Sequence, residues 1–398
     1  MDIEFNTFGK NLLEYFVKQF NGNKKKNPND NYIKLVMAND FFSAPEAIAP
    51  LAGIIDYLKA LGYKVYVKYG SNVLRSSGLN APFLVDKNQY ELLSPMYKVW
   101  RYNSPEEVFQ IVSALVAFLN HKVECAPGVL QAFEWTVNEV MDNVIQHSQS
   151  EYGYVVCTAT SGAHISVAIY DNGIGIMKSF KNSKYRFRSA TDAIMAAMQE
   201  KTTSDPEKGQ GNGLWGMSKL IKNNKGSLSI LSSSASVMID KCNNIEKKDR
   251  SVTLKTDTPF TIGTLVDFQF QCNNAVSIQD VFGVDYDFTN LTLEALEDES
   301  NRIHIKIKDF SFGYATRQAG SSARIMAINY VTQSNMKQQI IIDFEGVGIV
   351  ASSFADEYLG KLVQHFGFVV FNNLFKIINI GKENMAIVNR SIMQRNSQ

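Results

Sequence analysis

The chain has 398 residues, which is too long for one compact core and indicates two to three domains. Its composition, 45% hydrophobic and 20% charged, is that of an ordinary soluble globular protein. Forty basic and thirty-nine acidic side chains leave a net charge of +1. That balance excludes a global electrostatic attraction to nucleic acid or to an anionic membrane.

The cysteines indicate a reducing compartment. Cys125, Cys157, Cys242 and Cys272 are widely spaced and form no CxxC pair of the kind a zinc site needs. We therefore expect reduced, packed thiols. The apolar run at 114–119 is far shorter than the ~20 residues that cross a bilayer, and the N-terminus carries acids where a signal peptide would carry bases. A cytoplasmic protein without membrane association is expected.

The first hundred residues predict a short helix and then a small α/β domain. Apolar residues recur at helical spacing from Leu12 to Phe20, and the polar, basic segment 21–30 after them is interpreted as a linker. A strand at 32–40, a helix at 43–62 and a strand at 63–69 follow, with Ser43 as the expected helix cap. Strand, helix and strand in this order form a βαβ unit.

A different pattern begins near residue 104 and runs to about 272. Two helices are predicted at 104–122 and around 137–148, then a pair of strands within 152–171. Residues 176–210 are polar and interrupted, and are expected to form a mobile loop. A helix is expected to begin near 211, and further strands follow it.

The last part returns to an α/β pattern. Strands are predicted at 303–310 and 338–347, and each precedes a helix-like run. The fold class expected for the whole chain is therefore α/β. The expected parts are an N-terminal helix and basic linker (1–30), a small α/β domain (31–100), a central domain (101–275) and a C-terminal α/β domain (276–398).

The predicted helix around 137–148 carries unusual polar residues. Glu139, Asn143 and His147 are four residues apart, so they share one face of a helix. An ordinary wetted face would usually carry lysines and arginines, whereas this one carries short groups that are capable of chemistry. For His147 we expect a supporting role in capping its own helix.

Two glycine-rich loops follow this helix. Asp171 comes at the end of a predicted strand in "DNGIGI", and "GQGNGL" precedes a helix whose free amides can hold phosphate oxygens. Either loop alone is a weak indication. A helix with Glu-x-x-x-Asn, a strand with Asp-x-Gly-x-Gly and a Gly-x-Gly-x-Gly-Leu helix start, in this order, are specific.

These three motifs resemble those of the GHKL ATP-binding family, over roughly residues 104–272. The resemblance implies a Bergerat fold, an α/β sandwich in which ATP lies between a sheet and its helices. It implies that Asn143 coordinates Mg²⁺, that Glu139 is the general base, and that Asp171 accepts the adenine amino group. The further ATP-binding residues that it implies are Gly173, Gly175, Gly209, Gly211, Gly213, Leu214 and Thr264.

Within the family, the ending "NVIQHS" is most similar to the serine-kinase and anti-sigma-factor branch. The sensor-kinase branch has a phosphorylated histidine ahead of its ATP domain. His121 lies at such a place but lacks the acid that should follow it, which argues against histidine autophosphorylation. Lys201 and Lys208 could reach phosphates from the loop, although solvated lysines are the commoner case.

The C-terminal segment around 338–362 resembles the STAS fold of anti-sigma-factor antagonists. It is most similar to STAS-like domains of unknown function that accompany GHKL ATPases in bacteria. Ala351 stands where the antagonists have an aspartate. Ser352 and Ser353 are possible phosphoryl acceptors, but capping of their helix is the favoured interpretation of both.

The resemblances together imply a bacterial-type Mg-ATP switch with small STAS-like α/β domains on either side of the Bergerat fold, at 31–100 and 276–398, in a partner-switching type of signalling. The γ-phosphoryl group would pass to water or to a serine, since Glu139 can serve either acceptor. An alternative is an ATP-gated module that dimerises and hydrolyses ATP slowly, in a defence or scaffold complex. A non-hydrolysing sensor is a third possibility. A protein partner or a homodimer is expected, and the absence of a basic stripe argues against duplex binding.

Overall fold

The structure is a computed structural model, and it describes residues 1–5, 12–37, 45–160, 164–202, 211–249, 253–256, 260–283 and 291–396. The chain divides into two compact units. Unit 1 comprises residues 1–115 and 133–271, and unit 2 comprises residues 116–132 and 272–398. The division falls within helices α4 (Pro105–Lys122) and α5 (Val129–His147), so each of these helices belongs to unit 1 along part of its length and to unit 2 along the rest.

Unit 1 begins with a small parallel sheet. Strands β1 (Asp2–Phe5), β2 (Tyr32–Met37) and β3 (Lys64–Lys68) lie in the order β1-β2-β3 and are joined by α1 (Leu12–Lys26) and α2 (Pro45–Ala60). Helix α1 continues to Lys26, so residues 21–26 are helical where a linker was expected. Three lysines in its last turn favour the negative end of the helix dipole. The expected cap Ser43 lies outside the described residues.

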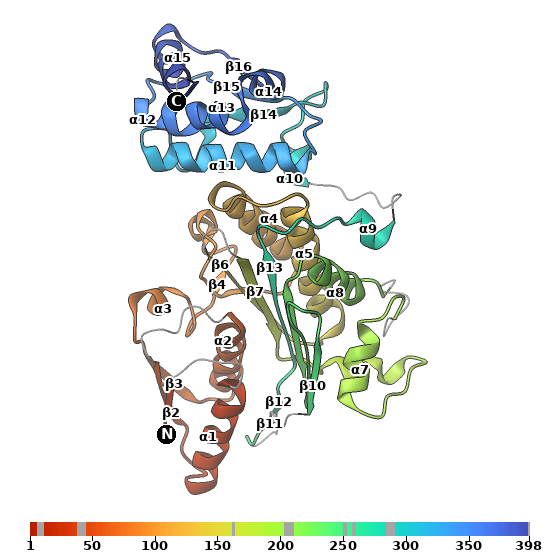
Figure 1. The fold of residues 1–398 in the computed structure, drawn as a ribbon. Helices are drawn as coiled ribbons and strands as arrows, with labels where there is room; N and C mark the ends of the chain where they lie inside the picture. The colour runs from red at the N-terminus through yellow and green to blue at the C-terminus, as the bar shows by residue number, and fades with distance from the viewer. Residues whose placement is uncertain are drawn as a thin grey trace. The chain divides into compact units, whose positions relative to one another are not determined.

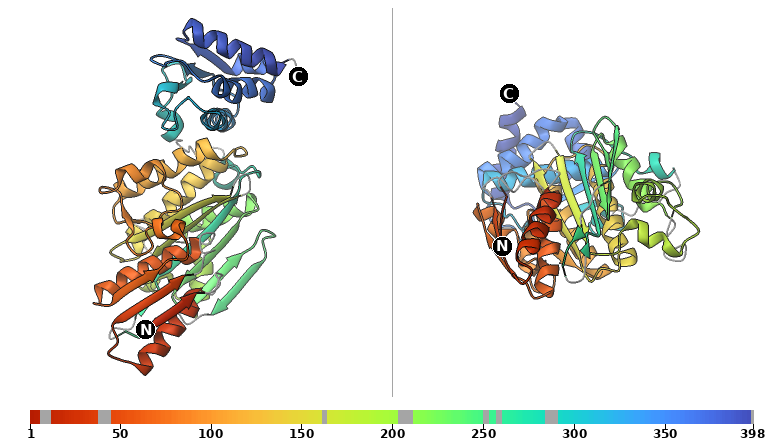
Figure 2. Two further views of the ribbon diagram at one scale, coloured as in Figure 1. Left: turned by 90° about the vertical axis from the view of Figure 1, so that its left-hand side faces the viewer. Right: turned by 90° about the horizontal axis from the view of Figure 1, so that it is seen from below.

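The second sheet of unit 1 has eight strands in the order β10-β9-β8-β13-β7-β6-β5-β4. Beyond the short pair β4–β5, its strands are antiparallel. Figure 2 shows these strands, yellow to green, beside the red N-terminal segment. Their bounds are β4 (Phe83–Leu84), β5 (Trp100–Tyr102), β6 (Gly153–Thr160), β7 (His164–Asp171), β8 (Ser227–Ser232), β9 (Ala235–Ile239), β10 (Ile245–Asp249) and β13 (Thr264–Gln271).

Helix α2 lies between the β1-β2-β3 sheet and the eight-stranded sheet of unit 1. It contacts β6, β7 and β13, and a side chain at Gly53 would meet the Tyr170 ring at 2.6 Å and the Tyr154 ring at 3.0 Å. Only a glycine allows the helix so close to these rings. Because α2 covers one face and other helices the opposite face, β6 and β7 are buried nearly throughout, which explains their continuous apolar sequence.

Unit 1 has further short helices and strands, most of them labelled in Figure 1. Helix α8 (Gly213–Asn223) contacts β8 and β13. Strand β10 is exposed along its whole length and carries Lys247 and Lys248, charges that discourage pairing at a sheet edge. The remaining elements are α3 (Asn72–Ser76), α6 (Ile176–Ser179), α7 (Ala190–Ala197), β11 (Thr253–Leu254) and β12 (Phe260–Thr261).

Unit 2 is built around a second parallel sheet, in the order β14-β15-β16. The strands are β14 (Ile303–Lys306), β15 (Ile340–Asp343) and β16 (Phe375–Ile378), and β15 is wholly buried. Helix α11 (Arg317–Gln333), capped by the Thr316 hydroxyl, links the first two strands. The other helices are α9 (Gln279–Phe282), α10 (Leu291–Glu294), α12 (Ser352–Ala355), α13 (Lys361–Phe366), α14 (Phe368–Leu374) and α15 (Lys382–Asn396), with a π-helical turn at Asp356–Gly360.

A buried amide joins the turn between α4 and α5 to helix α11 within unit 2. The Asn329 amide donates to the carbonyls of Asn120 and Val123, both at 2.8 Å, and accepts from the Cys125 N–H. Cys125 also contacts the thiol of Cys272, which together with burial raises the pKa of the Cys125 thiol. Two cysteines that are distant in sequence are therefore neighbours in the fold.

Each expectation about fold class is met. Both units combine helices with strands, and helices cover the sheets, so the α/β fold class is confirmed. In the described part of the chain, no helix combines the length and the apolar character needed to cross a membrane.

Candidate functional site

Helices α5 and α8 meet at Glu139, Asn143 and Gly213. A Cβ atom at Gly213 would lie 2.5 Å from Glu139 Oε2 and 3.4 Å from Asn143 Nδ2. The first residue of α8 therefore sits directly on the polar face of α5. The step of four residues puts Glu139 and Asn143 on one face of α5, and a glycine at the start of α8 lets that face be approached closely.

The polar groups at this meeting point are poorly solvated. Burial raises the pKa of Glu139, and the nearby Asp142 carboxyl raises it further. Asn143 Nδ2 is buried and has no hydrogen-bond partner among the described residues. Helix α8 begins at Gly213, and the side chain of its N-cap residue Asn212 makes no capping hydrogen bond. The first backbone amides of α8, which face this region, therefore have no capping side chain as an acceptor. A raised carboxyl pKa, an unpaired amide and an uncapped helix start together suit an anionic ligand with a bound cation.

Asp171 ends strand β7 and is only 3% exposed. Its Oδ1 accepts the Gly173 N–H at 2.7 Å and the Thr264 N–H at 3.4 Å. Burial nevertheless dominates and raises the pKa of Asp171 to about 7. This carboxyl is therefore held in place by backbone donors, in surroundings that favour a strong interaction with a ligand amino group.

Glycines shape the backbone around Asp171. A Cβ at Gly173 would collide with the Ser148 carbonyl, and one at Gly263 would lie 2.6 Å from Asp171 Oδ1. Gly175 has φ +77°, and its missing side chain makes room for the Ser233 hydroxyl. The sequence motif included Gly173 and Gly175 but not Gly263, although the "GT" pair before the strand of Thr264 was a usable indication.

A row of residues crosses the sheet through Asp171. The strand register pairs Asp171 with Thr264 on one side and with Gly153 on the other. Thr264 in turn lies opposite Ser232, and the two hydroxyls are 3.2 Å apart. The Ser232 hydroxyl also accepts the Ile176 N–H at 2.8 Å, which ties the loop after Asp171 to β8. Ser232 was missed because it shows its role only through the strand register.

The second glycine loop is only partly described. Gly209 and Lys208 lie outside the described residues. Gly211 has φ +76° and packs against the backbone of Thr202. Leu214, the second residue of α8, is half-buried, and Lys201 is exposed beside Glu200. The structure therefore brings Glu139, Asn143 and Gly213 into contact, and it groups Asp171, Gly173 and Thr264 at one strand end.

Ser352 and Ser353 are the first two residues of α12 in unit 2. The N-cap position belongs to Ala351, which makes no side-chain cap, so the interpretation of these serines as helix caps is wrong. Just before this helix, the side chain of Asn384 binds the Val350 N–H and the Gly348 carbonyl. Ser352 is exposed and Ser353 is half-buried.

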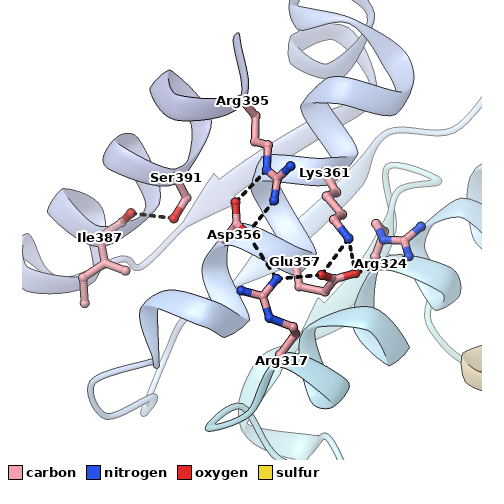
Figure 3. A network of polar contacts seen from close by, with 8 residues as sticks. All are labelled: Arg317, Arg324, Asp356, Glu357, Lys361, Ile387, Ser391 and Arg395. Atoms are coloured by element: carbon pink, nitrogen blue, oxygen red, sulfur yellow. Dashed lines mark hydrogen bonds and ion pairs between the residues drawn. The ribbon is translucent and has the colours of Figure 1, made fainter. Parts of the chain in front are cut away.

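A network of charges holds the helices after these serines (Figure 3). Arg395 binds Asp356 with two hydrogen bonds of 2.8 Å and lowers the pKa of that carboxyl. Glu357 is buried and pairs with Lys361 at 2.8 Å and with Arg324 at 3.5 Å. Both acids lie in the π-helical turn, so the network fixes that turn between α11 and α15.

Comparisons with known proteins agree with the geometry of unit 1. Residues 128–265 match the family described as histidine kinase-, DNA gyrase B-, and HSP90-like ATPase. The chain contains a GHKL domain. This family implies nucleotide binding. The matched residues include the polar face of α5, the end of β7 and the start of α8.

The C-terminal part has a match of its own. Residues 328–385 match the STAS-like domain of unknown function DUF4325, so the GHKL domain is combined with a STAS-like domain in one chain. This matched segment runs from the end of α11 to the beginning of α15 and includes both serines of α12.

Two solved structures are similar to parts of the chain. A mycobacterial sensor histidine kinase, MprB, is 16% identical, and the alignment covers 42% of this chain and 95% of that chain with a TM-score of 0.24. Full-length ShkA in complex with AMPPNP is 12% identical, with 95% and 72% covered and a TM-score of 0.23. No curated protein gives a significant match.

Proposed function

We propose that the GHKL domain binds Mg-ATP and transfers its γ-phosphoryl group, as a switch that acts with the STAS-like domain. The observation that carries this proposal is the contact of Gly213 with Glu139 and Asn143. This contact supports the proposal because it brings a carboxyl group, an amide and an uncapped helix start to one point. Asp171, at the end of β7, would receive the adenine amino group.

The residues of the site divide the work. Asn143 would hold Mg²⁺, which when bound would offset the charge of the phosphates. The uncapped start of α8 provides backbone amides for phosphate oxygens. Glu139 accepts the proton of the attacking hydroxyl, and its raised pKa brings its basicity closer to neutral pH.

The link to the STAS-like domain lies in helix α5. This helix carries Glu139 and Asn143, and the turn before it is held by Asn329 of α11. A change of nucleotide state that moves α5 would therefore strain or break the hydrogen bonds of Asn329. We further propose a cytoplasmic location, since that compartment supplies ATP.

The acceptor of the phosphoryl group is either water or a serine. Ser352 is the more accessible of the two serines at the start of α12. Incubation of the purified chain with γ-labelled ATP and Mg²⁺ separates the two outcomes, because one product is free phosphate and the other is phosphoserine. Ser352→Ala and Ser353→Ala then identify the acceptor, if it lies in this chain.

A matched pair of variants tests the general base. Glu139→Gln is expected to lower product formation by about 100-fold or more while ATP still binds. Glu134→Gln is the control, because Glu134 is also a buried carboxyl of α5 with a raised pKa, about 7. It lies about one and a half turns earlier and on a different face. Equal activity in Glu139→Gln and in the wild type would rule out the proposed base.

Nucleotide binding is tested separately from chemistry. Asn143→Ala should lose the Mg²⁺ dependence of ATP binding, and Asp171→Asn should weaken ATP binding with or without Mg²⁺. Sedimentation of the wild type with and without ATP examines the rival function, in which phosphate release accompanies nucleotide-dependent dimerisation. If the wild type binds ATP yet forms neither product, phosphoryl transfer is excluded.

A further inference from the structure

Tyr102 lies on the same face of the sheet as Asp171. The register pairs Tyr102 of β5 with Gly153 of β6, and Gly153 with Asp171 of β7. Residues directly opposite each other on neighbouring strands point to the same face. Tyr154 and Tyr170, the next positions along, face α2. Tyr102 and Asp171 therefore face away from α2.

The missing side chain of Gly153 brings Tyr102 toward Asp171. A Cβ atom at Gly153 would lie 2.6 Å from the Tyr102 hydroxyl, which shows that the ring leans across the glycine. On the far side of that glycine is the Asp171 carboxyl. Burial raises the pKa of the Tyr102 hydroxyl, and the negative charges of Asp171 and Asp142 raise it further.

The Tyr102 hydroxyl lacks a partner that burial should require. The side chain is only 1% exposed, and its hydroxyl has no hydrogen bond to any residue that the structure describes. Leaving a buried polar group unpaired destabilises the fold, and a phenylalanine would fill the same space without that cost. The unpaired Tyr102 hydroxyl thus lies on the same face of the sheet as the proposed adenine acceptor, where a bound ligand would supply its partner.

We propose that the Tyr102 hydroxyl reads the exocyclic amino group of the adenine base together with Asp171. That amino group has two hydrogens, of which Asp171 accepts one and the Tyr102 oxygen accepts the other. Guanine and hypoxanthine carry a carbonyl oxygen at this position. The hydroxyl thus adds specificity for 6-aminopurine nucleotides to the proposed ATP site, and the inference rests on that proposed function.

The test compares three nucleotides in three proteins. Affinities for ATP and for purine riboside triphosphate, which lacks the amino group, are measured by calorimetry for the wild type, Tyr102→Phe and Tyr170→Phe. Tyr170→Phe is a matched control, since Tyr170 is also fully buried with a hydroxyl unpaired among the described residues, but it faces α2. Inosine triphosphate serves as the carbonyl analogue.

Tyr102→Phe should bind ATP about 3- to 10-fold more weakly than the wild type, the effect of one hydrogen bond. Its affinity for purine riboside triphosphate should be unchanged, and Tyr170→Phe should match the wild type with every nucleotide. The ATP preference over inosine triphosphate should shrink in Tyr102→Phe. An unchanged ATP affinity overturns the inference, and so does an equal loss for both nucleotides, which would indicate a packing effect.

A second measurement needs no variant. N6-methyl-ATP keeps one amino hydrogen, so the wild type should bind it several-fold more weakly if both hydrogens are used. Binding as tight as that of ATP would overturn the inference even if Tyr102→Phe did not fold. If the wild type binds none of these nucleotides, the proposed function fails as well. If ATP binds and only these comparisons fail, the role of Tyr102 alone is excluded.

Discussion

Asn329 and Cys125 are joined by a hydrogen bond of 2.9 Å, from the backbone N–H of Cys125 to the side-chain oxygen of Asn329. The two residues are 204 positions apart in sequence. The same amide group also holds two carbonyls of the α4–α5 turn, and it is 1% exposed. The turn that leads into α5 of the GHKL domain is therefore completed by a residue of the C-terminal part.

Replacing Asn329 should destabilise unit 2. Asn329→Ala leaves two buried carbonyls and one buried N–H without their partner, and we expect a loss of about 2–3 kcal/mol in the free energy of unfolding. Urea denaturation followed by circular dichroism measures this loss. Gln338→Ala is the control, since Gln338 binds Glu297 and Asn301 at the surface and should cost under about 1 kcal/mol. Equal effects of the two changes would contradict the structural role given to Asn329.

Gly213→Ala should impair phosphoryl transfer more than folding. The added methyl group would meet the Glu139 carboxylate at 2.5 Å, and that carboxylate can move because it ends a flexible side chain. We expect product formation to fall at least about 10-fold, since a displaced base loses its alignment, with little change in the melting temperature. Gly381→Ala, just before α15 and with open space around it, should leave both quantities unchanged. Normal turnover in Gly213→Ala would argue against a base at Glu139.

Asp171 should make stability depend on pH. Its pKa is raised from 3.8 to about 7 in the folded chain, so between these values the folded state holds a proton that the unfolded state has lost. The stabilisation is full below about pH 4 and is lost as pH rises through about 7, with a slope of at most about 1.4 kcal/mol per pH unit.

Asp171→Asn removes the titration of Asp171 but keeps that of Glu134, whose pKa is also raised to about 7. The difference between the unfolding free energies of the wild type and the variant therefore reports the pH dependence that comes from Asp171. Denaturation curves at half-unit intervals from pH 4.5 to 8 provide the comparison. If the difference between the two proteins does not vary with pH, Asp171 is already ionised over that range.

Gly53→Ala should destabilise unit 1 although alanine favours helices. The new methyl group would lie 2.6 Å from the buried Tyr170 ring, which has no room to move, and such overpacking costs about 1–3 kcal/mol. Gly22→Ala in α1, with nothing near it, should instead stabilise by up to about 1 kcal/mol. Thermal denaturation distinguishes the two. A stabilised Gly53→Ala would mean that α2 does not lie against β7.

Local patterns in the sequence predicted the elements that carry the site. The four-residue steps of Glu139 and Asn143 required only the helical period, and the apolar segments that form β6 and β7 sufficed to predict a pair of strands within 152–171. The predicted end of the first helix, near Phe20, was wrong, because α1 continues to Lys26. A basic, polar segment can complete a helix when its lysines lie in the last turn, where they interact favourably with the helix dipole.

Features that depend on strand register or on distant contacts were out of reach. Ser232 and Tyr102 reach the site only because the register aligns them with Thr264 and Gly153, and no local pattern encodes that alignment. The pairing of Cys125 with Cys272 and the amide of Asn329 depend on chain segments that are far apart. The spacing of these residues in the sequence does not predict that they are in contact.

The hydrogen bond between Cys125 and Asn329 can form only late in the synthesis of the chain, because Asn329 is made 204 residues after Cys125. A ribosome that adds about 5–20 residues per second needs roughly 10–40 s to reach Asn329 after it has made the turn. During that interval the carbonyls of the turn have only water as a partner. The turn between α4 and α5 therefore lacks its contacts with Asn329 until the carboxyl-terminal third of the chain has been made. A premature stop codon after β13 would remove these contacts altogether.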